Sequence, residues 1–320
     1  MINNSLKYLK EKGYISGEAL AQKLGISRVA VWKQIKKLKN MGYKIIADQN
    51  LGYCLISRPD LLIPQEIQRE LYTEYIGKEI YYFPELKSTN IMAKEKALQG
   101  IEKIKEGTLI IAERQSAGKG RLGREWFSPI GGIWISIILY PQLSPSYIPR
   151  ITLMSAVAVV KAIKICTQIE PQIKWPNDIL INEKKVCGIL TEMNAELDII
   201  NWVVVGIGIN ANIDHRAFPQ DIQENTISLK EVAGKEVLRI KLVQAFLQEF
   251  EKHYESLKRR EFSSILKEWK LNSHTLGRKV KVDMGERIIT GEAVDIDKEG
   301  ALVLKKEDGK LIKIISGTVV

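Results

Sequence analysis

Apolar residues near the N-terminus recur at the spacing of helices. Leu6 and Leu9 fit a first helix, and the run from Gly17 to Leu24 fits a second. A third helix is predicted from Arg28 to Asn40, behind Ser27 as a natural N-cap. The short segment that joins the last two predicts a helix-turn-helix.

The pattern then changes to that of strands. Two β-prone runs, 43–47 and 52–56, flank a polar turn and predict a hairpin, which is the wing of a winged helix. Two prolines interrupt the segment 58–64, which reads as a linker. We therefore expect a winged helix-turn-helix domain over residues 1–60.

Strands and helices mix irregularly after the linker. The predicted elements are a helix over 65–75, a strand over 79–83, a helix over 88–99, strands over 108–113 and 132–140, a helix over 149–168, strands over 173–182, 185–194 and 201–209, and a helical stretch over about 237–270. Three strands in quick succession favour a largely antiparallel sheet with helices packed on it. We expect an α+β domain with a mixed sheet over residues 65–270.

The C-terminal residues 271–320 repeat a strand and turn pattern. Glycines at 285, 300 and 309 separate four short β-prone runs, which lie at 279–282, 288–294, 301–305 and 310–315. This pattern predicts a small SH3-like β-barrel. The whole chain is thus expected to be a multidomain α+β protein.

Positive charge concentrates in the first predicted domain. The formal net charge is +10, and residues 1–60 hold eleven Lys and Arg against four Asp and Glu, a net +7. Such a concentration favours a polyanionic partner over a merely solvated basic helix, and nucleic acid is the first candidate. In a helix-turn-helix the third helix enters the major groove. The candidate DNA contacts are Ser27, Arg28 and Lys33 near base edges and Lys36 and Lys37 near phosphates.

Other features exclude several classes of protein. No apolar run reaches the roughly 18 residues of a membrane span, and the N-terminus lacks a signal-peptide core, so we expect a cytoplasmic protein without a membrane partner. Cys54, Cys166 and Cys187 lie far apart among apolar neighbours, and no chemistry is assigned to them.

The segment 115–126, Gln-Ser-Ala-Gly-Lys-Gly-Arg-Leu-Gly-Arg-Glu-Trp, alternates glycines with cations. Glycines let backbone N–H groups approach a phosphate, and Lys and Arg add charged hydrogen bonds, so the loop suits an anion such as ATP. Taken alone, however, such a mixture of Gly, Lys and Arg favours a mobile surface loop with solvated charges.

A second motif, Lys-Trp-Pro-Asn-Asp at 174–178, precedes Lys185 and Gly188. Proline within a β-prone run removes a ladder donor and needs an explanation. Alone, the Asn-Asp pair could form a turn, and Lys185 could be an exposed lysine. With the glycine loop about fifty residues earlier, however, the two motifs form one pattern.

Over nearly its whole length the chain resembles the bifunctional biotin-protein ligases that also repress the biotin operon. The family loop Gly-Arg-Gly-Arg-x-Gly-Arg-x-Trp matches residues 118–126, with Lys119 in place of an arginine. Lysine keeps the charge but loses the planar fork of arginine.

The resemblance implies site residues, with Lys185 and Arg121 as the catalytic cations. The implied biotin-binding residues are Ser88, Thr89, Asn90, Gln115, Gly118, Lys119, Gly120, Arg121, Lys185 and Gly188. The implied residues for ATP and the adenylate are Arg121, Arg124, Trp126, Lys174, Asn177 and Asn210, with Asp178 as a candidate Mg²⁺ ligand. Some have structural alternatives, since Ser88 could instead cap the following helix.

The implied reaction joins biotin and ATP into biotinyl-5′-AMP and transfers biotin to a lysine of a biotin carboxyl carrier protein. No enzyme nucleophile is needed, in keeping with three histidines that all lie outside the motifs, at 215, 253 and 274. The resemblance also implies operator DNA as a partner, the adenylate as corepressor and a homodimer. The alternatives are a lipoate-type protein ligase and a biotin-sensing repressor without activity.

Overall fold

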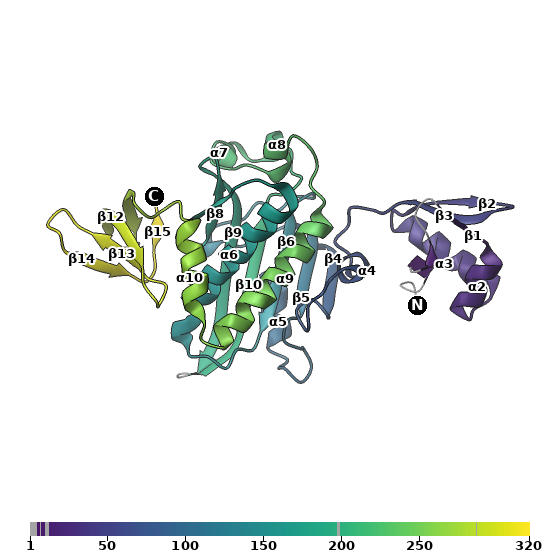
Figure 1. Ribbon diagram of the computed structural model, residues 1–320, viewed down its shortest axis with the longest axis horizontal. Helices are drawn as coiled ribbons and strands as arrows, with labels where there is room; N and C mark the ends of the chain where they lie inside the picture. The colour runs from purple at the N-terminus through teal and green to yellow at the C-terminus, as the bar shows by residue number, and fades with distance from the viewer. Residues whose placement is uncertain (1–4, 7, 10–12, 197–198, 286) are drawn as a thin grey trace. The chain divides into compact units, whose positions relative to one another are not determined.

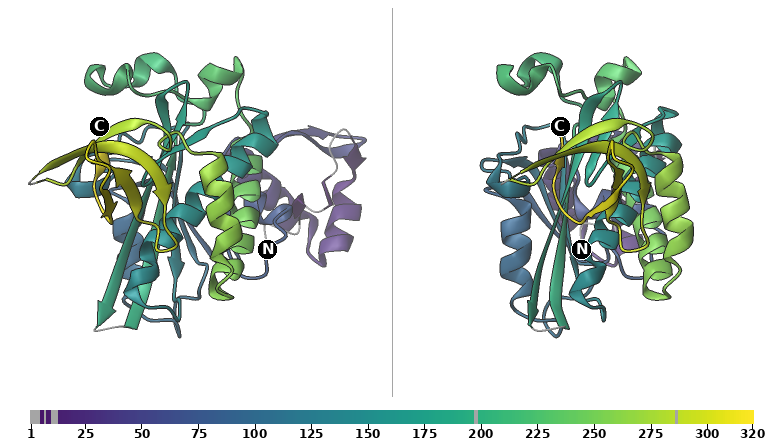
Figure 2. Two further views of the ribbon diagram at one scale, coloured as in Figure 1. Left: turned by 60° about the vertical axis from the view of Figure 1, so that its left-hand side comes forward. Right: turned by 90° about the vertical axis from the view of Figure 1, so that its left-hand side faces the viewer.

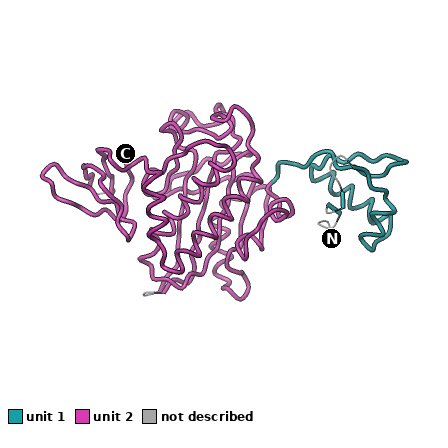
Figure 3. The backbone as a smooth tube through the Cα atoms, in the orientation of Figure 1, with its two compact units in different colours: residues 1–61 teal, residues 62–320 magenta. Residues whose placement is uncertain are grey.

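The computed structural model describes residues 5–6, 8–9, 13–196, 199–285 and 287–320. The chain divides into two compact units, Met1–Leu61 and Leu62–Val320 (Figure 3). Within the described residues, no helix combines the length and the apolar character that crossing a membrane requires.

The first unit is a winged helix (Figure 1). Its described elements are β1 Tyr14–Ile15, α2 Gly17–Leu24, α3 Arg28–Asn40, β2 Lys44–Asp48 and β3 Gly52–Ser57. The predicted helix-turn-helix and hairpin are confirmed, and β1 adds an unpredicted third strand in the order β1-β3-β2. Ser27 caps α3, since its Oγ accepts a hydrogen bond from Ala30 N at 3.2 Å. Leu6 and Leu9 are buried, but the rest of the first predicted helix lies partly outside the described residues.

A seven-stranded mixed sheet forms the centre of the second unit. Its strands are β4 Ile80–Leu86, β5 Leu109–Gln115, β6 Ile133–Leu139, β7 Gln172–Lys174, β8 Asp178–Ile181, β9 Lys184–Glu196 and β10 Ile199–Ile209. They follow the order β4-β5-β6-β10-β9-β8-β7, with β4 and β5 parallel and the remaining pairs antiparallel. The prediction of a single strand over 173–182 is wrong. It is two strands, β7 and β8, because Pro176 cannot donate to a ladder between them.

Helices cover both faces of this sheet. The helices of this unit are α4 Pro64–Arg69, α5 Thr89–Ala97, α6 Ile148–Thr167, α7 Gln220–Gln223, α8 Leu229–Ala233, α9 Arg239–Lys258 and α10 Phe262–Leu271. Of these, α7 and α8 lie beyond one end of the sheet (Figure 1). The helix predicted over 65–75 ends already at Arg69. The stretch predicted over 237–270 is two helices, which separate where Arg260 takes a left-handed backbone with φ 65°. The short helices α7 and α8 were not predicted.

Alternate residues of each central strand face different helices. Leu109 and Ile111 of β5 join the large core that includes α6 and α9, whereas Ile110 joins a smaller core with Ala93 and Ala97 of α5. This period of two is what a sheet buried on both faces requires. Figure 2 shows α6, α9 and α10 on one side of the sheet and α5 on the other.

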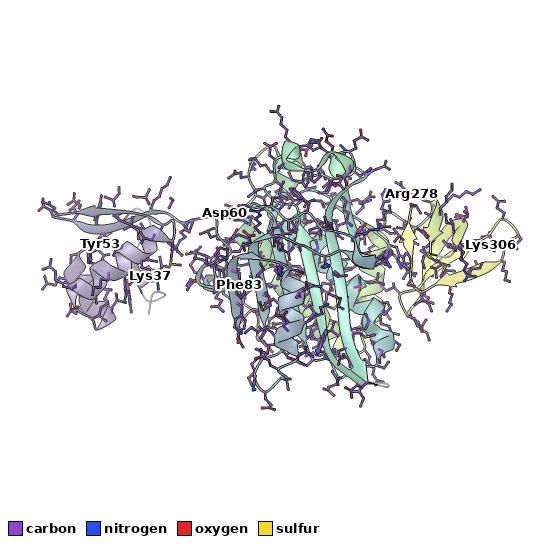
Figure 4. The ribbon with its side chains drawn as sticks, turned by 180° about the vertical axis from the view of Figure 1, so that it is seen from behind. Lys37, Tyr53, Asp60, Phe83, Arg278 and Lys306 are labelled. Atoms are coloured by element: carbon purple, nitrogen blue, oxygen red, sulfur yellow. The ribbon has the colours of Figure 1, made fainter. Side chains whose placement is uncertain are left out.

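The C-terminal residues form a five-stranded antiparallel sheet. Its strands are β11 Lys279–Asp283, β12 Ile288–Ile296, β13 Leu302–Lys305, β14 Leu311–Ile314 and β15 Thr318–Val319, in the order β14-β13-β12-β11-β15. The expected small β domain is confirmed, with β15 as an unpredicted strand. It contacts the larger sheet's domain through Arg278, labelled in Figure 4, whose Nη1 lies 3.1 Å from Glu183 Oε1.

Candidate active site and DNA-binding helix

A cavity of about 290 Å³ opens where the glycine-rich loop meets β9 and β10. Most of the predicted site residues line it. They are Ser88, Thr89, Asn90, Gln115, Lys119, Gly120, Arg121, Arg124, Trp126, Asn177, Asp178, Lys185, Gly188 and Asn210. Segments more than a hundred residues apart in the sequence thus converge on one site.

Gln115 holds the start of α5. Its Oε1 accepts hydrogen bonds from Thr89 N at 2.7 Å and Thr89 Oγ1 at 3.1 Å, and its Nε2 donates to Ser128 Oγ at 2.8 Å. Ser88 makes no side-chain capping bond, although it stands at the N-cap position and is almost fully buried. The capping alternative for Ser88 is therefore wrong. Gln115 takes that role, and Ser88 is one of the residues that line the cavity.

Asn90 is held in one orientation at the same end of the cavity. Its Nδ2 donates to Glu192 Oε2 at 2.9 Å, while its Oδ1 accepts from Ser136 Oγ at 2.5 Å. The other oxygen of Glu192 lies 2.7 Å from Lys94 Nζ. A carboxylate can only accept at neutral pH, so Glu192 fixes which end of the Asn90 amide is the donor.

Glycines on β10 and β9 let neighbouring side chains of the site lie directly against the sheet. A Cβ at Gly206 would lie 2.1 Å from Asn90 Oδ1, and one at Gly208 would lie 2.5 Å from Trp126 Nε1. Gly208 and Gly188 are paired neighbours on β10 and β9. Glycine is required at these positions for close approach and not for an unusual backbone conformation.

Lys185 is fixed at the start of β9. Its backbone N donates to Asn225 O at 2.8 Å, and its carbonyl accepts from Ile227 N at 3.1 Å. The ammonium group lies 2.7 Å from Asp178 Oδ1 and 4.9 Å from the centre of the Trp126 ring. A cation is thereby positioned on the cavity wall before any substrate enters.

Arg121 brings a second cation to the cavity. Its Nη1 donates to Asn177 Oδ1 at 2.8 Å, and its Nη2 donates to the carbonyl of Gly317 at 3.0 Å. Asn177 is itself held by its Nδ2, which donates to Ile189 O at 2.8 Å. Burial lowers the pKa of the Arg121 guanidinium, while the Asp178 carboxylate opposes that shift.

Two predicted site residues lie outside the cavity lining. Gly118 packs beneath the loop, since a Cβ there would lie 2.3 Å from Trp126 O. Lys174 stands opposite Asp178 in the register of the antiparallel strands β7 and β8, but it does not line the cavity. Asn210 does line it, and its Nδ2 donates to the carbonyl of Ile227 at 3.3 Å.

Sequence analysis did not identify several residues of the site. Ser136 and Glu192 had a signal, because each is a polar residue within an otherwise sheet-forming run. The lining residues Phe218, Asp221, Ile222, Asn225, Thr226 and Thr318 come from a long connection and the last strand. Nothing in their local sequence indicates that they reach the cavity.

The described residues contain no group of three or more His, Cys, Asp and Glu side chains that could hold a metal ion. Asp178 lines the cavity, but its carboxylate is paired with Lys185. Magnesium needs about six oxygen ligands and often takes most of them from phosphates and water. These side chains do not form a cation site of their own.

In the first unit, the five candidate DNA contacts lie on α3 or at its cap. Ser27, Arg28, Lys33, Lys36 and Lys37 are all exposed, and Lys37 is labelled in Figure 4. The opposite face of α3 is buried through Val31, Ile35 and Leu38. The basic face of the helix is therefore open to a partner.

Three family models match successive parts of the chain. The model of the biotin/lipoate A/B protein ligase family matches residues 82–210, an HTH domain model matches residues 2–54, and the biotin protein ligase C terminal domain matches residues 275–320.

Individual proteins match over similar lengths. The bifunctional ligase/repressor BirA of Bacillus subtilis is 40% identical over 96% of this chain and 93% of its own, and that of Escherichia coli is 30% identical over 91% and 88%. The solved structure of the biotin protein ligase from Aquifex aeolicus in complex with biotin and ATP has a TM-score of 0.66 and 31% identity, and it covers 76% of this chain and 98% of that protein. With all three domains in this order, the chain belongs to the biotin protein ligase family, among its bifunctional ligase/repressors.

Proposed function

We propose that this protein activates biotin with ATP and attaches it to a lysine of a biotin carboxyl carrier protein. The observation that carries the proposal is the convergence of Lys185 and Arg121 on one cavity between the glycine-rich loop and two glycine-containing strands. A carboxylate and a triphosphate repel each other, and cations fixed at both groups lower the barrier to their reaction.

In the first step a biotin carboxylate oxygen attacks the α-phosphorus of ATP. The new O–P bond gives biotinyl-5′-AMP, and pyrophosphate leaves with the electron pair of the broken bond. In the second step the amine of the acceptor lysine attacks the acyl carbon, loses a proton and displaces AMP. The chain's part is to bind, orient and neutralise charge, which requires no covalent enzyme intermediate. Mg²⁺ would arrive with the phosphates of ATP, and Asp178 stays a candidate ligand to which we assign no step.

The first unit is proposed to bind operator DNA with biotinyl-5′-AMP as corepressor. Its basic α3 and the name shared by the bifunctional relatives support this part of the proposal. A homodimer is expected, because two winged helices can then read two symmetric half-sites. Such partners would place the protein in the cytoplasm.

A ligation assay separates the proposal from its alternatives. Labelled biotin, ATP and a carrier domain should give pyrophosphate and a labelled acceptor, whereas lipoate in place of biotin should give neither. A repressor that only senses biotin would release no pyrophosphate. A lipoate-type ligase would prefer the other acid.

Replacing Arg121 by glycine should release the activated intermediate. The change removes both guanidinium hydrogen bonds of Arg121. The loop then loses its contact with Asn177 on the cavity wall and its contact with Gly317, the residue before β15. Free biotinyl-5′-AMP should then label lysines on a bystander such as serum albumin, detected with labelled streptavidin. Arg114→Gly, at an exposed position on β5, serves as the control. Labelling that stays confined to the acceptor would count against this role of Arg121.

Replacing Glu192 by leucine should weaken biotin binding. Lys94 would lose its partner, and Asn90 Nδ2 would lose its shorter hydrogen bond and keep only the one to the carbonyl of Leu190 at 3.3 Å. Losing an acceptor at a buried donor destabilises it by about 1–3 kcal/mol. We expect the KM for biotin to rise roughly ten-fold or more, with kcat for pyrophosphate release little changed. Glu192→Gln keeps an acceptor oxygen and should recover most of the loss, and Glu196→Leu on the exposed end of β9 is the matched control. A fall in kcat alone would contradict the positioning role.

A further inference from the structure

The outward face of α3 carries two exposed apolar side chains. Val29 is 64% exposed and Trp32 is 52% exposed, one helical turn apart. Neither contributes to the buried face of the helix, which consists of Val31, Ile35 and Leu38. Fold stability therefore does not account for an exposed indole at this position.

The charged side chains of α3 are all cations. The sequence of α3 contains no Asp or Glu, and Arg28, Lys33 and Lys36 are exposed on the same helix. Lys36 Nζ lies 5.3 Å from the centre of the Trp32 ring, so the indole has a cation over its face. The surface fits a partner that is strongly anionic and also offers small apolar groups.

The major groove of duplex DNA has that combination. Phosphates surround it, and the C5-methyl group of thymine is the apolar feature that the base edges present there. Val29 and Trp32 lie three residues apart, about 4.5 Å along the helix axis. That separation is comparable with the roughly 3.4 Å rise between base pairs, so both can meet neighbouring pairs.

We propose that Val29 and Trp32 read thymine methyl groups in the major groove, and so determine part of the operator's sequence. The proposal rests on the DNA binding proposed above and extends it to the bases that are read. Arg28 lies beside Val29 in the first turn, where helix-turn-helix proteins contact base edges. Lys36 holds the Trp32 indole against the groove and neutralises a nearby phosphate.

The first part of the test finds a duplex that the protein prefers. Full-length protein with biotin and ATP selects from a randomised duplex pool at one fixed salt concentration. Each thymine of the enriched duplex is then replaced by deoxyuridine, which lacks only the methyl group. For the wild-type protein, we expect a loss of affinity of about four-fold at each thymine that is read, the equivalent of one buried CH₂ group.

The second part assigns the loss to residues. Val29→Ala and Trp32→Ala should each bind the thymine duplex more weakly and should no longer distinguish uracil at the position that the residue reads. Lys39→Ala, on the same helix, should lower affinity for all duplexes while keeping the uracil effect. Both apolar positions are exposed. Each variant should keep the uracil effect at the position that the other residue reads, which will show that its winged helix is still folded.

Two results would overturn the proposal. Equal affinity of the wild-type protein for thymine and uracil duplexes would show that no methyl group is read. An undiminished uracil effect in both Val29→Ala and Trp32→Ala would show that other residues read it. If the wild-type protein enriches no duplex, the proposed DNA binding itself fails, and that outcome is distinct from the other two.

Discussion

Lys185→Ala is expected to slow the formation of biotinyl-5′-AMP by about two to three orders of magnitude, or ~3–4 kcal/mol, the usual effect of removing one fixed donor from a developing anionic centre. The ammonium group is held between Asp178 and the Trp126 ring, on a strand whose backbone is paired on both sides. Its position therefore needs no rearrangement when the two anions meet. The variant also leaves the Asp178 carboxylate unpaired beside them, which adds repulsion.

Pyrophosphate release under single-turnover conditions measures this effect. Lys184→Ala is the matched control, because Lys184 precedes Lys185 on β9 and does not line the cavity. The double variant Lys185→Ala/Asp178→Asn should recover part of the lost rate, since it removes the uncompensated carboxylate. A rate near that of the wild type in Lys185→Ala would remove this residue from the reaction.

Deleting residues 1–60 should abolish DNA binding and leave adenylate formation intact. Every residue that lines the cavity lies between Ser88 and Thr318, whereas the deleted segment holds most of the net positive charge. The cut precedes Leu62 because that residue is buried and its N donates to Glu113 Oε1 at 2.7 Å. The other oxygen of Glu113 pairs with buried Arg239 at 2.9 Å, so a longer deletion would disturb an internal ion pair.

Fluorescence anisotropy across a range of salt concentrations tests this expectation. If a dimer of the full-length chain neutralises roughly six to ten phosphates, log K against log salt should slope at about −5 to −9. Lys36→Ala and Lys37→Ala should each make that slope shallower. Binding by the truncated chain with the same steep slope would place the basic surface elsewhere.

Local patterns in the sequence predicted most of the fold and the centre of the site. Ser27 before an apolar period gave α3, and the glycine-rich loop with the Lys174 motif gave two walls of the cavity. Asn177 was expected beside a nucleotide, and that expectation stays a prediction. In the structure, the Oδ1 of Asn177 accepts a hydrogen bond from Arg121. The role of Gln115 as the cap of α5 depends on a contact between residues 26 positions apart. Such contacts have no local signal.

The same limit explains what was missed. Thr318 and the segment around Phe218 reach the cavity only because the chain returns to it after long intervals. The break between α9 and α10 depends on one left-handed residue, Arg260, that is neither Gly nor Asn. Helical periodicity continues through that point, so the pattern predicted one long element where the structure has two.

The glycines of β9 and β10 bear on how this protein tolerates mutation. A one-carbon addition at Gly206 or Gly208 meets Asn90 or Trp126 at a distance that real atoms do not adopt. At Gly25 and Gly123, by contrast, the added carbon meets nothing within 4 Å, although the backbone is left-handed. In a library of all single substitutions, the first pair should tolerate no replacement under selection for biotinylation, whereas Gly123 should tolerate asparagine. Gly25 lies in the unit that adenylate formation does not need, so its tolerance of asparagine is measured under selection for DNA binding. The library would then distinguish two reasons why a glycine resists replacement. One is the lack of room for a side chain inside the enzyme, and the other is backbone strain at its surface.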